Sequence, residues 1–176
     1  MAGSHALVQP RVRAWPVAIA LAAAAQALPW FVHLIRLPGP VLLPMHFAAV
    51  LAGLALGPTA GLLNGLVAPV VSFLLTGLPP AALVPLMAAE VAAYGGVAGY
   101  LTHRTACRGA WTVLAALAAG RLVLLPAVAL MGPALGVKAS ASSFVLNAAL
   151  VGWPGIALQI VLLSPLARVL APVARR

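Results

Sequence analysis

Glu90, Arg121 and His46 are the residues whose types could carry charged chemistry inside an otherwise apolar chain. Glu90 is the only acid in the 176 residues, and it lies in the apolar stretch from Pro44 to Tyr100. An ionised side chain inside such a stretch is costly and is by default a candidate functional residue. Two interpretations stay open. Glu90 and Arg121 form a structural ion pair that fixes helix packing, or Arg121 faces a ligand with a carboxylate or phosphate.

The sequence contains no recognisable catalytic or metal-binding motif. A single carboxylate excludes an acid pair, and HExxH, GxSxG and P-loop patterns are absent. A dyad of His46 with Ser72 or Ser143 stays open, but nothing in the sequence orients it. The single cysteine, Cys107, excludes an internal disulfide, and two histidines without acids (His33 and His46) are a weak metal signal. We predict that the chain is not an enzyme and needs neither a metal nor a cofactor.

A few further polar and aromatic residues could contact a ligand. Four of them fall in what would be the outer half of the spans: Ser72, Thr76, Asn147 and Trp153. Tyr94 and Arg36 complete the substrate-binding candidates, with His46 and Arg121. Asn64 and Gln159 fall in the inner half, where hydrogen bonding between helices is the expected role.

The composition requires a membrane environment for these residues. The chain is 64% hydrophobic and 6% charged, whereas a soluble domain carries roughly 25% charged residues. About 20 apolar residues cross a bilayer. Glycine and proline divide the chain into six predicted transmembrane helices, at about 14–33, 45–56, 59–75, 82–101, 110–131 and 143–163. We therefore predict an all-α integral membrane protein with one transmembrane domain, 1–176.

The basic residues predict the orientation of these spans. With the N-terminus in the cytoplasm, seven basic residues are cytoplasmic and two are external, which agrees with the positive-inside rule. The cytoplasmic residues are Arg11, Arg13, Arg104, Arg108, Arg168, Arg175 and Arg176, and the external ones are Arg36 and Lys138. Both termini are then cytoplasmic, with tails at 1–13 and 164–176. No cleavable signal peptide is evident, and the net charge of +9 indicates headgroup anchoring rather than nucleic-acid binding.

Two features near the first span could serve an interaction. Small residues recur there at four-residue spacing, which lets another helix approach closely. These are Ala14, Ala18 and Ala22, and also Ala20 and Ala24. The spacing alone fits internal packing and docking of a partner subunit equally well. The following segment, 34–44 (LIRLPGPVLLP), is apolar but contains three prolines, which preclude an ordinary helix. It either folds back as an external lid loop or lies at the interface.

The stretch LPMHFAAVLAGLALGPTAGLLNGLVAPVVSFLLTGLPP resembles the substrate-binding membrane subunit (S component) of energy-coupling-factor (ECF) vitamin transporters. The acid and tyrosine of MAAEVAAYGGVAGYL and the pattern G-x-P-G-I-x-x-Q, which ends at Gln159, carry the same resemblance. Together these motifs cover the chain from the second to the sixth predicted span. They are moderately specific for the superfamily and do not identify a substrate.

The resemblance implies a six-helix subunit of a prokaryotic cell membrane that captures a vitamin or related micronutrient with high affinity on the external side. It implies that the loop 34–44 caps the site. It further implies that the alanine rows of the first span dock on a transmembrane coupling subunit driven by two cytoplasmic ATPases. Pantothenate or a pyridoxine-type compound would fit the few polar candidates, and a large corrinoid stays open. The alternatives are an intramembrane enzyme that uses His46 and a serine, and a ligand-free structural or assembly protein.

Overall fold

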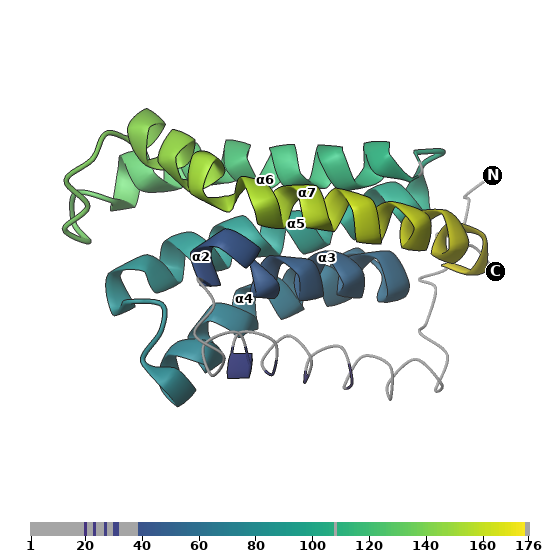
Figure 1. Ribbon diagram of the computed structural model, residues 1–176, viewed down its shortest axis with the longest axis horizontal. Coiled ribbons are helices and arrows are strands. Elements are labelled where there is room, and N and C mark those ends of the chain that lie inside the picture. Colours follow the sequence, from purple (N-terminus) through teal and green to yellow (C-terminus); the bar gives the residue numbers. More distant parts are fainter. Residues whose placement is uncertain are drawn as a thin grey trace, which may run out of the picture.

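The computed structural model describes residues 39–107 and 109–174, and the single positions 20, 23, 27, 30 and 31. Within these residues every regular element is helical, so the all-α prediction is confirmed for this part of the chain. The elements are α2 (Gly39–Leu42), α3 (Pro44–Leu56), α4 (Pro58–Thr76), the short 3₁₀ helix η1 (Ala81–Leu83), α5 (Val84–Arg104), α6 (Ala110–Met131) and α7 (Ala141–Ala174). Helices α3 to α7 run broadly along the long axis of the molecule (Figure 1).

Four helical segments are long and apolar enough to cross a membrane: Pro58–Thr76, Ala81–Arg104, Ala110–Met131 and Ala141–Pro165. Helix α3 is apolar but shorter, with 13 residues, which corresponds to about 20 Å at 1.5 Å per residue. These five helices match the second to sixth predicted spans. The first predicted span, about 14–33, lies mostly outside the described residues. The chain is thus a multi-pass membrane protein, while six spans and cytoplasmic termini stay predictions.

Proline and glycine set the helix boundaries as their backbone chemistry requires. A proline occupies the first turn of α3, α4 and α5, where a backbone N–H would have no partner within the helix. Gly57 connects α3 to α4 with φ of 101°, and Gly77 ends α4 with φ of 73°. Such positive φ values strongly favour glycine. The sequence signals that predicted these two turns therefore correspond to real backbone requirements.

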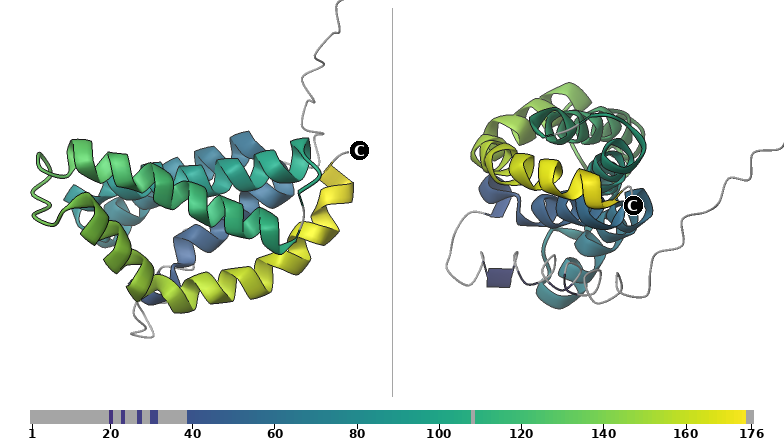
Figure 2. Two further views of the ribbon diagram at one scale, coloured as in Figure 1. Left: turned by 90° about the horizontal axis from the view of Figure 1, so that it is seen from above. Right: turned by 90° about the vertical axis from the view of Figure 1, so that its right-hand side faces the viewer.

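Two segments differ from the sequence-based expectation. The predicted loop 34–44 contains α2, a single helical turn. Pro40 is tolerated there because a backbone N–H in the first turn would have no acceptor within the helix. The last helix runs to Ala174, so most of the predicted tail 164–176 is helical. Pro154 and Pro165 lie inside α7, and the helix bends along its length (Figure 2). A proline inside a helix removes one backbone hydrogen bond and allows such a bend.

Glycines bring the backbones of α3, α4 and α5 into direct contact. A Cβ atom added to Gly95 of α5 would collide with the backbone of Gly61 in α4 and would lie 2.8 Å from the carbonyl oxygen of Ala49 in α3. Gly53 and Gly99 make equally close backbone approaches. Small residues permit this packing in membranes, where the hydrophobic effect does not drive helices together. These three helices therefore form a rigid frame for the side chains that α5 carries.

Two apolar clusters fill much of the bundle, beside a small contact between Ala48 of α3 and Ala68 of α4. The larger joins α3, α5, α6 and α7 and includes Val50, Leu54, Tyr94, Ala98, Val113, Ala116, Leu117 and Leu163. The smaller lies around Leu86, Leu124 and Val128. Large apolar residues also point outward, as expected for helices that face lipid. Examples are Leu74 on α4, Leu130 on α6 and Val161 on α7, which are 73%, 81% and 67% exposed.

Candidate functional site

A cavity of about 370 Å³ opens between the start of α3, the connection from α4 to α5, and the facing parts of α5, α6 and α7. This volume lies near the lower end of the range typical of small-molecule sites. Its wall is mainly apolar and includes Leu43, Met45, Leu78, Leu83, Leu86, Met87, Leu124, Phe144 and Val151. The polar residues of the wall are His46, Glu90, Arg121 and Asn147.

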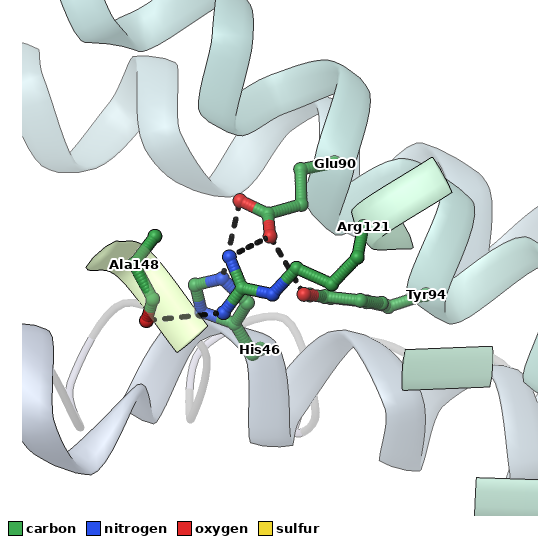
Figure 3. A network of polar contacts seen from close by, with 5 residues as sticks. All are labelled: His46, Glu90, Tyr94, Arg121 and Ala148. Carbon is green, nitrogen blue, oxygen red and sulfur yellow. Dashed lines mark hydrogen bonds and ion pairs between the residues drawn. The ribbon is translucent and has the colours of Figure 1, made fainter. Parts of the chain in front are cut away.

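A compact polar cluster forms part of this wall (Figure 3). Arg121 Nη1 lies 2.6 Å from Glu90 Oε1, and the Tyr94 hydroxyl donates to the same oxygen at 2.6 Å. His46 Nε2 lies 3.8 Å from Glu90 Oε2. Arg121 Nη2 also donates to the carbonyl oxygen of Ala148, at 3.5 Å. Four helices, α3, α5, α6 and α7, thus converge on one carboxylate and one guanidinium.

Helical spacing explains which residues of η1 and α5 face the cavity. Positions 86 and 87 each lie three or four residues after 83 and before 90, and 94 lies four residues after 90, so these positions share one face. Leu83, Leu86, Met87 and Glu90 line the cavity. Tyr94 is 1% exposed and packs against His46 with ring centroids 5.1 Å apart. Its hydroxyl donates the hydrogen bond to the Glu90 carboxylate. Gly120 of α6 adjoins the Tyr94 ring, since an added Cβ would overlap it.

The segment before α3 closes one side of the cavity. Leu43, which lines it, has φ of 51°, a left-handed conformation that is uncommon for a residue with a side chain. The Leu43 side chain lies over Gly152 of α7, where an added Cβ would be 3.0 Å from Leu43 Cδ1. The backbone of α2 lies against Gly155, whose added Cβ would be 2.6 Å from the carbonyl oxygen of Val41. Two glycines of α7 thus let α2 and Leu43 pack closely against this helix.

The cluster keeps hydrogen-bonding capacity that it does not use. Arg121 Nε and His46 Nδ1 are buried and have no hydrogen-bond partner among the residues that the structure describes. The Arg121 side chain is 16% exposed, whereas that of Glu90 is 5% exposed. Arg121 is therefore the more accessible residue of the ion pair.

The structure brings only some of the predicted substrate-binding residues to the cavity. His46, Arg121 and Asn147 line it, and Tyr94 lies behind Glu90. Ser72 and Thr76 do not line it: the Thr76 hydroxyl donates to the Ser72 carbonyl oxygen at 2.8 Å and helps to end α4. Trp153 is 65% exposed and also lies away from the wall. Arg36 lies outside the described residues.

The remaining predictions concern docking, metal and catalysis. Of the five alanines, Ala20 is described and exposed, and the others (Ala14, Ala18, Ala22 and Ala24) lie outside the described residues. In the part of the chain that the structure describes, no group of three His, Cys, Asp or Glu residues could hold a metal ion. Within that part, His46 makes no hydrogen bond to Ser72 or Ser143; Ser143 instead accepts from Ser140 at 2.8 Å.

The apolar wall was not predicted, although a signal for it existed. Counting back from Glu90 in helical steps reaches Met87, Leu86 and Leu83, which line the cavity. Counting both ways from Asn147 by three or four residues reaches Phe144 and Val151 in the same way. The Ala148 carbonyl had no sequence signal, because any residue could supply a backbone oxygen.

Comparison with known families gives the context for this geometry. A family model described as "ECF transporter, substrate-specific component" matches residues 16–167. The chain belongs to this family. No curated protein and no solved structure matches it. As an S component, the chain is a substrate-binding subunit of a membrane transporter, and the family implies a small-molecule substrate and a coupling partner. Membership of a transport family argues for binding rather than catalysis.

Proposed function

We propose that this S component captures a vitamin or related micronutrient in the cavity at high affinity and docks on a transmembrane coupling subunit driven by two ATPases. The observation that carries the proposal is the apolar cavity with a polar cluster on one wall. Small-molecule sites typically combine mainly apolar walls with a few placed polar groups. The family match supports a transport role for such a cavity.

The position of the cavity supports capture from outside the cell. It lies at the end of the bundle that contains the starts of α3, α5 and α7, and the positive-inside rule assigns this end to the external side. Exposed Arg104 marks the opposite end, at the C-terminus of α5. The α2 segment and Leu43 then correspond to part of the predicted lid. The volume of about 370 Å³ favours a small vitamin over a large corrinoid.

Ligand identification tests the proposal directly. The chain is purified without added vitamins, and small molecules released on denaturation are identified by mass spectrometry. A vitamin-like compound in stoichiometric amount, which raises the thermal stability when it is added back, is the expected result. Absence of any released compound, together with no thermal shift from a vitamin panel, would contradict the proposal.

A matched pair of variants then locates the binding site. Ala148→Leu adds a side chain to the cavity wall, whereas Ala149→Leu adds the same side chain at the neighbouring position, which does not line the cavity. Only Ala148→Leu is expected to abolish binding of the released compound. Equal binding by both variants would place the site elsewhere.

A further inference from the structure

The one acid of the cavity already has a cationic partner, and this limits the ligands that the cavity can hold. Glu90 is the only acid in the whole chain, and Arg121 Nη1 already lies 2.6 Å from its Oε1. Tyr94 and His46 surround the same carboxylate. A cationic ligand would have no other acid to pair with, and would have to separate Glu90 from Arg121. Breaking a buried pair is strongly unfavourable.

An anionic ligand would find nitrogen donors in the cavity wall that have no partner yet within the segments that the structure describes. Arg121 Nε is buried and has no partner in the described part of the chain, and the Arg121 side chain is more exposed than that of Glu90. Arginine carries five N–H donors in a planar arrangement, so it can hold Glu90 and a second carboxylate together. His46 Nδ1 is a second buried nitrogen without a partner among the described residues. Arg121 and His46 thus both lie beside Glu90, and Arg121 already compensates the charge of that single acid.

The rest of the chain reinforces this preference. Its formal net charge is +9 with Glu90 included, so no other residue contributes negative potential around the cavity, and the summed field attracts anions. The remaining wall consists mainly of leucine, methionine, valine and phenylalanine side chains. These surfaces favour an apolar body over a ligand that is polar throughout.

We infer that the ligand is a small organic acid, with a mainly apolar body against the leucine-rich wall and a carboxylate on Arg121. This inference rests on the proposed function and adds the chemical class of the substrate. Asn147, another residue of the cavity wall, supplies an amide to a polar group elsewhere on the same molecule. Cationic compounds are excluded by the prior pairing of Glu90.

Matched probes that differ only in the acidic group test the inference. The pairs are biotin and biotinamide, lipoate and lipoamide, and pantothenate and pantothenol, with thiamine as the cationic probe. Binding to the purified protein is measured by titration calorimetry and by thermal shift, alongside mass spectrometry of the released compound. For a pair that binds, we expect the acid to bind at least about tenfold more tightly, because hydrogen bonds to charged groups are stronger than those between neutral groups.

Variants show whether Arg121 is the source of that preference. The double change Glu90→Gln/Arg121→Gln keeps the net charge of the pair and should make the acid and its amide or alcohol bind equally. Lys138→Gln is the control, because it removes an exposed cation that does not line the cavity, and it should leave the preference unchanged. If the double variant fails to fold, Arg121→Lys in the wild-type background is expected to weaken the acid more than its neutral partner.

The outcomes separate this inference from the proposed function. A released compound with a carboxylate, or an acid preference that the double variant loses, supports both. A neutral or cationic compound that binds in the cavity with equal or higher affinity overturns the acidic class and leaves the transport role intact. Failure of every probe to bind, with no compound released, contradicts the proposed function and the inference with it.

Discussion

Arg121 Nη1 lies 2.6 Å from Glu90 Oε1, and this contact joins α6 to α5 beside the cavity. The pair is supported on both sides, by the Tyr94 hydroxyl on the carboxylate and by the Ala148 carbonyl on the guanidinium. It therefore has two consequences in the same place: it fixes the packing of two helices, and it sets the polar character of the cavity wall.

Removing one member of this pair should destabilise the fold more than removing both. Glu90→Gln leaves a buried guanidinium without its anion, and Arg121→Gln leaves a buried carboxylate without its cation. Each is expected to lower the free energy of unfolding by about 3 kcal/mol, as for other broken buried pairs. The double variant should recover part of that loss. Thermal unfolding in detergent measures the coupling, and strictly additive effects would show that the two residues do not act as a pair.

Two neighbouring glycines of α5 should respond oppositely to alanine. Gly95→Ala places a methyl group against the backbones of Gly61 and Ala49, so α4 must shift, at a cost of about 1–3 kcal/mol. Gly96→Ala meets only the Leu62 side chain at 3.6 Å and should be neutral or stabilising, because alanine favours helix by up to about 1 kcal/mol. Thermal melting of the two variants in one detergent makes the comparison. Equal stability would argue against backbone contact between α4 and α5.

The packing of α2 against Gly155 of α7 offers a test of whether α2 and Leu43 act as part of a lid. Gly155→Val would push Val41 and Leu42 away from α7 and displace the segment that leads into Leu43. We expect the ligand identified by mass spectrometry to bind about tenfold more weakly, which corresponds to about 1.4 kcal/mol. Ala157→Val, at an exposed position of the same helix, is the control. Unchanged affinity in Gly155→Val would remove the α2 segment from the binding site.

Docking on a coupling subunit should depend on a small side chain at Ala20, which is exposed in the described structure. Ala20→Trp should reduce uptake and co-purification of the coupling subunit while ligand binding stays intact, because a bulky ring prevents close helix approach. Leu130→Trp adds bulk at an exposed position of α6 and should have little effect. Loss of ligand binding in Ala20→Trp, with assembly preserved, would contradict a docking role.

Fluorescence can report occupancy of the cavity. Trp30, Trp111 and Trp153 are 57%, 74% and 65% exposed, so ligand binding should change their emission little. Phe144 lines the cavity, and Phe144→Trp should add a signal that the ligand quenches or shifts. Leu146→Trp, at an exposed position two residues away, serves as the comparison. A ligand response from Leu146→Trp alone would show that the ligand binds at another face of α7 and not in the cavity.

Local chemistry in the chain was enough to predict helices at α3 to α7 and the charged candidates. Prolines at the first turns and glycines at positions 57 and 77 mark boundaries because their backbone geometry is intrinsic to the residue type. Glu90 and Arg121 stood out because an ionised group in an apolar segment is costly wherever the segment packs. The family resemblance rested on the same segments, and the family match confirms it.

Which residues line the cavity depended on packing between helices that are distant in the sequence. Ser72 and Trp153 have suitable side chains, yet Ser72 is buried outside the cavity wall and Trp153 is exposed away from it. Hydropathy could not reveal this, because apolar residues cover every face of a helix whose outer side meets lipid. The rotation of each helix follows instead from glycine contacts such as Gly61 with Gly95. Those contacts turn Glu90 toward Arg121 and His46, and so create the site.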